Sequence, residues 1–101
     1  MLAKPAARNN DRQICTQPLS AGGGAHVGGK IMALGISQVF INQRAAAVVG
    51  DNCECQELPC QIAGGSGTVF IGGKAVARQY DRTTHNPSAV SEGSPDVFIG
   101  G

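Results

Sequence analysis

Three short apolar stretches recur along the chain with the same spacing of small and large residues. Each contains a Val-Phe-Ile segment whose phenylalanine lies five residues after a glycine, and the three phenylalanines are Phe40, Phe70 and Phe98. Aromatic and β-branched residues favour extended structure, so each stretch predicts a short strand. Strand alternation alone does not say which side chains are buried. We interpret the phenylalanines as packing residues, and a partner-binding surface is the alternative.

A second repeated element joins a cation, a run of small residues and an aspartate seven positions after the cation. Its copies are Lys4 to Asp11, Arg44 to Asp51 and Lys74 to Asp81. Phenylalanine and aspartate are eleven residues apart in both 40–51 and 70–81, so the strand and this element form one unit. The repetition favours aspartates that accept backbone N–H groups in turns over catalytic carboxylates.

This unit predicts a hairpin in which a strand, a tight turn and a small-residue return strand follow one another. The turn falls at Asn42-Gln43 in one copy and at Gly72-Gly73 in another. No segment keeps a 3.6-residue period over ten residues, and glycines interrupt the chain throughout, so little or no helix is expected. The sequence therefore predicts a small all-β fold of three short hairpin-like repeats around a pseudo-threefold axis.

The composition indicates a thin core. The 101 residues include 15 glycines and only three Phe and one Tyr as aromatic residues, so a metal, a disulfide or a partner is expected to add stability. A net charge of +1 with 15% charged residues argues against nucleic acid or an anionic membrane as a partner. No stretch approaches the roughly 18 apolar residues of a membrane span, and the N-terminus lacks the apolar run of a signal peptide. We expect a soluble protein, made in the cytoplasm, without stable membrane insertion.

Candidate metal ligands follow from the repeated aspartates. Counting four residues on from each aspartate reaches Cys15, Cys55 and His85, which converge if the three units surround one axis. The longest of the three loops, 29 residues from aspartate to phenylalanine, supplies His26 as a fourth ligand. Two histidines and two cysteines suit tetrahedral zinc, with iron as the alternative metal.

The two other cysteines have lesser roles in this interpretation. Cys60 is the reserve ligand, and Cys53 is a weaker candidate. Alternate residues of an extended segment point to opposite sides, so Cys53 and Cys55 make a poor local bridge. In a chain without a signal peptide we expect metal binding rather than disulfides.

These residues resemble those of the PAAR-repeat family, which is named for a Pro-Ala-Ala-Arg motif. The motif stands at residues 5–8, and degenerate copies stand at 45–48 and 75–78. The resemblance runs from Lys4 to Gly101. The chain departs from the family's usual Arg-Val-Gly-Asp at 8–11 and 78–81, and from its common His-Gly-Gly after His85.

The resemblance implies a cone-shaped cap with zinc near its apex, seated on a trimeric β-helical spike protein of the VgrG type, one chain per trimer. Such spikes belong to contractile injection machines: type VI secretion systems, phage tails and extracellular contractile injection systems. Effectors are the further partners that the resemblance implies. The protein would then leave the cytoplasm as part of the injection particle, to the outside or into the target cell. A monomer of three similar units matches a threefold partner.

Two other functions compete with a structural spike tip. A zinc-stabilised adaptor would bind cargo without travelling on a spike. A small zinc hydrolase needs an open coordination position and a positioned base, whereas four protein ligands close the coordination sphere and no HExxH motif is present. We therefore expect no enzymatic activity. We also expect a single domain over 1–101 without an appended effector domain, because the sequence ends directly after the third repeated strand.

Overall fold

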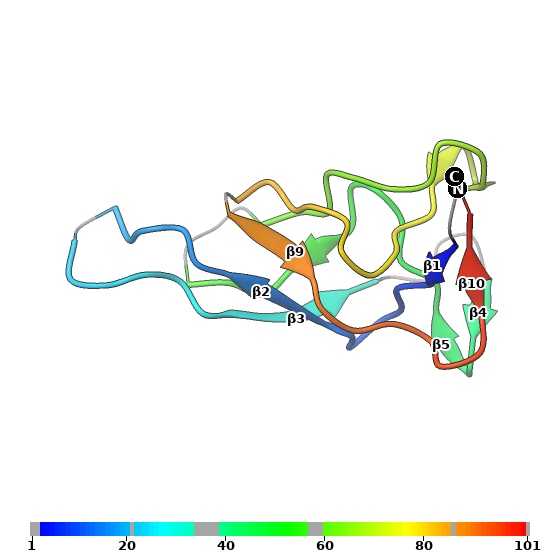
Figure 1. Ribbon diagram of the computed structural model, residues 1–101, viewed down its shortest axis with the longest axis horizontal. Coiled ribbons are helices and arrows are strands. Elements are labelled where there is room, and N and C mark those ends of the chain that lie inside the picture. Colours follow the sequence, from blue (N-terminus) through cyan, green and yellow to red (C-terminus); the bar gives the residue numbers. More distant parts are fainter. Residues whose placement is uncertain (1–2, 21, 34–38, 57–59, 86, 101) are drawn as a thin grey trace.

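The described residues of the chain form three two-stranded ribbons and one four-stranded sheet. The computed structural model describes residues 3–20, 22–33, 39–56, 60–85 and 87–100. The molecule measures 39 × 28 × 23 Å and narrows from the ribbons at one end to a long loop at the other (Figure 1). Within the described residues all regular structure is strand, which confirms the expectation of a small all-β cone. The described part holds no helix with the length and apolar character needed to cross a membrane.

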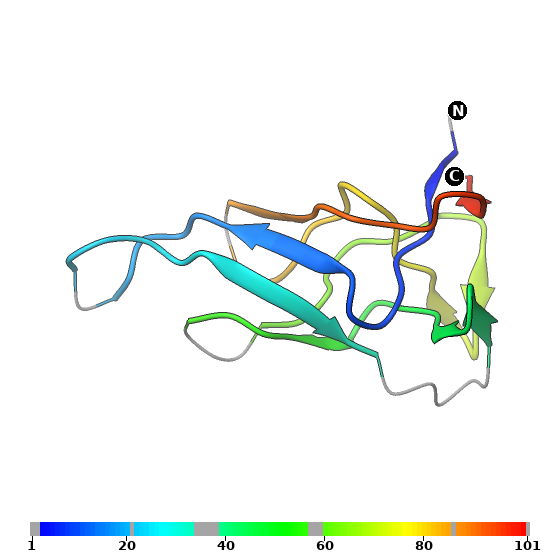
Figure 2. The ribbon, with the colours of Figure 1, turned by 90° about the horizontal axis from the view of Figure 1, so that it is seen from below.

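The three ribbons share one register. They are β4 (Phe40–Ile41) with β5 (Arg44–Ala45), β7 (Phe70–Ile71) with β8 (Lys74–Ala75), and β10 (Phe98–Ile99) with β1 (Lys4–Pro5). In two ribbons the phenylalanine lies opposite an alanine of the return strand, and in the third Phe98 lies opposite Pro5. Two ribbons are the expected hairpins, whereas the third joins the last strand of the chain to the first (Figure 2). The pseudo-threefold arrangement is therefore complete only once β1 and β10 have paired.

Both hairpin turns use left-handed backbone at their two central residues. The φ angles are 53° at Asn42 and 67° at Gln43 in one turn, and 57° at Gly72 and 80° at Gly73 in the other. Two consecutive positive φ angles define the type I′ turn, whose twist matches that of the flanking strands. The predicted positions of both turns are confirmed.

A closed ring of backbone hydrogen bonds marks the pseudo-threefold axis. The N–H of Ala7 donates to the carbonyl of Ala77 at 2.9 Å, Ala47 donates to Ala7 at 3.0 Å, and Ala77 donates to Ala47 at 2.9 Å. All three alanines are fully buried. Three chain segments approach this closely because their side chains are single methyl groups. The repeated small residues of the sequence are thus the residues that surround the axis.

The repeated aspartates close the turns that follow this ring. In each unit an Asp Oδ2 accepts the backbone N–H three residues earlier, at 2.8 to 2.9 Å; the pairs are Arg8 with Asp11, Val48 with Asp51, and Arg78 with Asp81. The residue before each aspartate has a positive φ, and these residues are Asn10, Gly50 and Tyr80. The interpretation of the aspartates as turn residues is confirmed.

The four-stranded sheet carries the chain from the ribbons toward the narrow end. Its order is β6 (Asn52–Cys53), β3 (Gly28–Met32), β2 (Arg12–Cys15) and β9 (Ser88–Val90), with antiparallel neighbours. Gln13 and Cys15 point inward from β2 while their neighbours face solvent. The long loop between β2 and β3 projects beyond the sheet at the narrow end (Figures 1 and 2).

The three phenylalanines do not pack in the interior. Phe40, Phe70 and Phe98 are 61%, 55% and 54% exposed, so their interpretation as packing residues is wrong. The isoleucine that follows each phenylalanine packs instead against a small cluster that includes Ala6 and Ala46. Successive residues of a strand face opposite sides, so burying the isoleucine exposes the phenylalanine. The ribbon end of the molecule therefore presents one exposed aromatic ring from each unit.

Candidate metal centre

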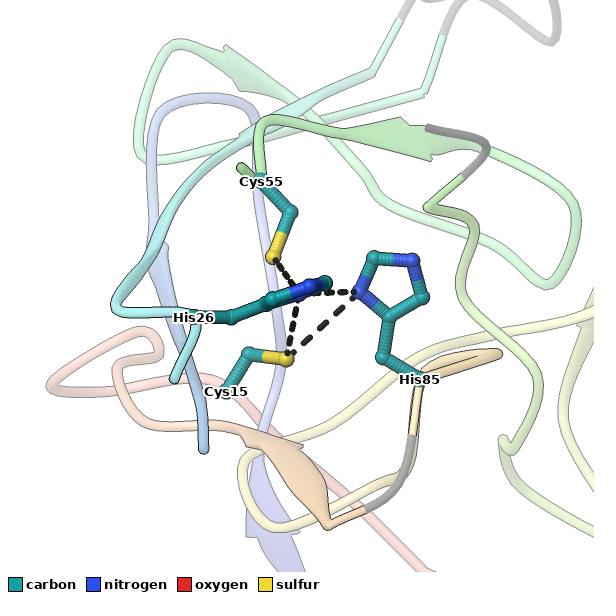
Figure 3. Close-up of side chains that lie close together, drawn as sticks. All are labelled: Cys15, His26, Cys55 and His85. Carbon is teal, nitrogen blue, oxygen red and sulfur yellow. Dashed lines mark hydrogen bonds between the residues drawn. The ribbon is translucent and has the colours of Figure 1, made fainter. Parts of the chain in front are cut away.

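Two cysteines and two histidines from four segments converge near the base of the long loop between β2 and β3. Cys15 Sγ lies 3.4 Å from His26 Nδ1 and 3.5 Å from His85 Nδ1. His26 Nδ1 lies 3.1 Å from both Cys55 Sγ and His85 Nδ1. The ligand atoms of all four residues lie within 4.8 Å of one another, and the side chains point toward one centre (Figure 3). The four residues singled out from their spacing in the sequence are the four that the fold brings together.

The four segments reach this centre from the sheet. Cys15 is the last residue of β2, which runs away from the ribbons (Figure 1). His26 lies just before β3, Cys55 two residues after β6, and His85 three residues before β9. The centre is therefore formed where the strands end, in the half of the molecule opposite the ribbons.

Backbone and side-chain bonds fix the two ligands of the β2–β3 hairpin. The N–H of His26 donates to the carbonyl of Gln17 at 2.8 Å, and the N–H of Cys15 donates to the carbonyl of Val27 at 3.4 Å. Gln56 Oε1 accepts the N–H of Val27 at 2.5 Å and the N–H that follows it at 3.0 Å. Because Gln56 follows Cys55, this amide connects the His26 loop to the Cys55 segment. No pattern in the sequence singled out Gln56.

The two glycines after His26 allow two close approaches, one between β3 and β2 and one between β3 and the Cys55 segment. A Cβ on Gly28 would lie 2.3 Å from the carbonyl oxygen of Gln13, and φ at Gly28 is +103°. A Cβ on Gly29 would lie 2.8 Å from the Cβ of Glu54. Gln13 Nε2 donates to the Glu54 carbonyl at 2.6 Å across this contact. A side chain at 28 would therefore force β2 and β3 apart next to Cys15, and one at 29 would push the Cys55 segment away from the hairpin.

His85 is held by two hydroxyl groups. Its N–H donates to Thr83 Oγ1 at 3.3 Å, and the Ser88 hydroxyl donates to its carbonyl at 2.7 Å. The Thr83 and Ser88 hydroxyls are also hydrogen-bonded to each other. Both backbone polar groups of His85 therefore have a hydroxyl partner.

Burial sets the electrostatics of the cluster. Cys15, His26 and His85 are at most 8% exposed, and Cys55 is half-buried. Burial raises the pKa of the Cys15 thiol; a backbone hydrogen bond with Gln17 lowers the pKa, and the adjacent Cys55 thiol raises it. Two thiolates this close would repel each other. A divalent cation between them would remove the repulsion and favour both thiolates.

The donor set and its spacing fit a tetrahedral metal. With Zn–N near 2.1 Å and Zn–S near 2.3 Å, the edges of a tetrahedral site are about 3.4 to 3.8 Å. The separations of Cys15 Sγ from the two histidine nitrogens, 3.4 and 3.5 Å, match that range, and the 3.1 Å between Cys55 Sγ and His26 Nδ1 is shorter. Imidazole nitrogen and thiolate sulfur are the ligands that zinc takes in structural sites, and bound zinc would supply electrostatic cross-linking there.

The reserve ligand Cys60 does not join the cluster. Cys60 forms a disulfide with Cys53, and the two Cα atoms are 5.2 Å apart. The expectation of metal binding in place of disulfides is therefore wrong for this pair. The spacing of Cys53 and Cys55 gave no hint of it, because the partner comes from a segment that folds back beside β6, where the Cys53 N–H donates to the Cys60 carbonyl at 2.8 Å.

The fold and the cluster define a small all-β protein with pseudo-threefold symmetry and a candidate four-ligand metal centre. A family model for the PAAR motif matches residues 21–91. The chain therefore belongs to the PAAR-motif family. Proteins of this family serve as structural spike tips of contractile injection systems, and the chain is in this sense a component of a secreted injection particle. No curated protein and no solved structure matches it.

Proposed function

We propose that the protein is a zinc-stabilised, non-enzymatic cap of a trimeric β-helical spike of the VgrG type. A single chain of the protein closes the end of one spike trimer. The observation that carries this proposal is the exposed triad Phe40, Phe70 and Phe98 at the ribbon end. The three rings lie at equivalent positions of three ribbons with one register, so a single chain presents a nearly threefold apolar surface.

The ribbons also offer backbone groups to a partner. Each ribbon is two-stranded, and within the described residues no third strand joins it. The carbonyls of Pro5, Ala45 and Ala75 on the inner strands accept N–H groups from neighbouring units, so the edges left for a partner are those of β4, β7 and β10. Open strand edges favour pairing with another chain, and a trimeric β-helix ends in three such edges. Docking would satisfy backbone groups on both sides and bury the phenylalanine rings.

Zinc bound by Cys15, His26, Cys55 and His85 would stabilise the opposite, narrow half. The main core cluster holds only alanine, valine and isoleucine side chains, five of its eight buried residues being alanines, so the apolar surface that it buries is small. Four protein ligands leave no coordination position for a substrate, which favours a structural over a hydrolytic role. Effectors are further partners under this proposal, and delivery of the cap with its spike would carry it out of the cytoplasm.

The test is the mass of a complex with a spike trimer from the same genome. We expect one chain per trimer, and we expect the combined variant Phe40→Asp, Phe70→Asp and Phe98→Asp to lose binding. Tyr80→Asp is the matched control, because Tyr80 is 65% exposed but lies outside the ribbons. Three copies per trimer, or equal binding by the triad variant, would overturn the cap and favour a cargo adaptor.

A further inference from the structure

The Cys53–Cys60 disulfide closes a loop that contains a candidate metal ligand. Cys53 ends β6, and Cys55 follows it by two residues inside the closed loop. Both bridged cysteines are at most 1% exposed, and the Ile31 position of β3 pairs with Cys53. The start of the Cys55 segment is therefore anchored both to the sheet and to residue 60.

The segment that follows Cys60 is bonded to the loop that carries His85. The N–H of Thr84 donates to the Gln61 carbonyl at 2.8 Å, and the N–H of Gln61 donates to Thr84 Oγ1 at 3.1 Å. Thr84 immediately precedes His85. The disulfide thus joins the backbone of the Cys55 segment to the backbone that positions His85.

The other two ligands do not need such a link. Cys15 and His26 belong to one hairpin and are connected through the ladder between β2 and β3. Cys55 and His85, in contrast, come from segments thirty residues apart in the sequence. Cys55 follows β6 and His85 precedes β9, and these are the two edge strands of the four-stranded sheet. The covalent bridge therefore strengthens the connection between two ligands that no strand ladder of the sheet joins directly.

We propose that the Cys53–Cys60 disulfide is a redox-sensitive clamp that positions Cys55 and His85, so that the oxidised chain retains its metal longer than the reduced chain. This inference rests on the proposed metal site. A closed loop has fewer alternative conformations, which limits the motions that carry Cys55 off the metal. Groups that orient metal ligands change metal affinity by about 10- to 100-fold.

Reduction opens the clamp by a balanced step. With a trialkylphosphine as reductant, phosphorus gives two electrons to the bridge and the S–S bond breaks. Water supplies the oxygen of the phosphine oxide and the two protons that leave Cys53 and Cys60 as thiols. The backbone hydrogen bond from Cys53 to Cys60 then remains as a weaker, non-covalent link.

The experiment measures zinc transfer to a chromophoric chelator. Zinc-loaded wild-type protein with the bridge intact is compared with the variant Cys53→Ser/Cys60→Ser, and we expect about 10-fold faster release from the variant. Equal release rates would overturn the clamp while leaving the metal site standing. Failure of the wild-type chain to take up one zinc would instead refute the proposed site itself.

Two controls separate positioning from overall stability. Val76→Ala removes buried side-chain volume next to the β7–β8 ribbon, where Val76 pairs with Val48 and its backbone bonds to Val69 and Ser66 rather than to a ligand residue. If Val76→Ala speeds release as much as loss of the bridge at a matched loss of stability, the clamp is refuted. Should the double variant not fold, phosphine-reduced wild-type protein replaces it, and reoxidation must restore slow release.

Discussion

Arg44 Nη1 lies 3.0 Å from Asp11 Oδ1, so the cation of one repeat pairs with the aspartate of another. Lys4 Nζ lies 3.9 Å from Asp81 Oδ1 in the same manner. Both cations precede an aspartate of their own repeat by seven residues, yet each pairs with the aspartate of a neighbouring unit. These ion pairs, together with the alanine ring, connect the three units around the axis.

Asp11→Ala should be strongly destabilising. Asp11 is 1% exposed and accepts hydrogen bonds from Arg8 Nε and Nη2 at 2.9 and 2.8 Å, besides the Arg44 contact. Its removal leaves the buried Arg8 guanidinium without its main partner, a loss of about 3 kcal/mol or more. Urea denaturation measures this loss in the free energy of unfolding. Asp51→Ala is the control, with an expected loss of about 1 kcal/mol, because Val48 stands where the other turns have arginine. Equal losses would contradict the argument.

The protein should become less stable as the pH rises above the ordinary pKa of an aspartate, because Asp51 resists ionisation in the folded state. Burial raises the pKa of Asp51, while the Val48 N–H and Lys74 lower it by less. The native state therefore keeps this proton to a higher pH than the unfolded chain, whose aspartates titrate near about 3.9. The free energy of unfolding then falls between the unfolded and the raised native pKa. Comparing Asp51→Asn with the wild type over that interval isolates this contribution.

Val48→Arg should offset the effect of burial on Asp51 by giving its carboxylate a guanidinium partner. The substitution reproduces the arginine found at Arg8 and Arg78, each of which donates through Nε to its aspartate at 2.9 Å. We expect the pKa of Asp51 to drop and stability at neutral pH to rise by about 1 kcal/mol. NMR titration and urea denaturation measure the two effects. Loss of stability with an unchanged pKa would show that the guanidinium does not reach Asp51.

Metal removal should loosen the fold. Apparent binding free energies of structural zinc are about 10 kcal/mol or more, as large as the stability of a small domain. Chelated protein should therefore melt at a much lower temperature than zinc-loaded protein in calorimetry. Identical melting temperatures of the two forms would show that the metal does not stabilise the fold.

Single ligand variants should empty the site. We expect Cys15→Ser, His26→Ala, Cys55→Ser and His85→Ala each to reduce zinc content well below one per chain, as measured by elemental analysis. Cys53→Ser should still bind one zinc, although it should release the metal faster. A result in which Cys53→Ser empties the site and Cys15→Ser does not would overturn the ligand assignment.

Gly29→Ala should disrupt the site through a single methyl group. Its Cβ would lie 2.8 Å from the Glu54 Cβ and 2.9 Å from the Glu54 carbonyl oxygen, so the Cys55 segment must shift. We expect a destabilisation of about 1 to 3 kcal/mol together with weaker zinc binding. Gly100→Ala is the matched control, because a Cβ at this position would meet open space. If both variants behave alike in melting and zinc titration, close approach at Gly29 is not required.

Local features of this protein were predictable from the sequence alone. The type I′ turns, the aspartates that cap their own turns and the small residues around the axis depend on backbone geometry within a few residues, and this geometry repeats with the sequence. The convergence of Cys15, Cys55 and His85 was predictable for the same reason, since equivalent positions of related units converge on a shared axis, whereas His26 was expected only from the length of its loop.

Tertiary structure alone decided which partners meet across units and which side of each strand is buried. Phe40 and Ile41 are both apolar, and a two-residue strand has no longer pattern that ranks one face over the other; contact with the neighbouring units buries the isoleucine. The Arg44–Asp11 pair and the Cys53–Cys60 bridge likewise depend on how separate segments pack. Such pairings arise from distances in space, which sequence spacing does not contain.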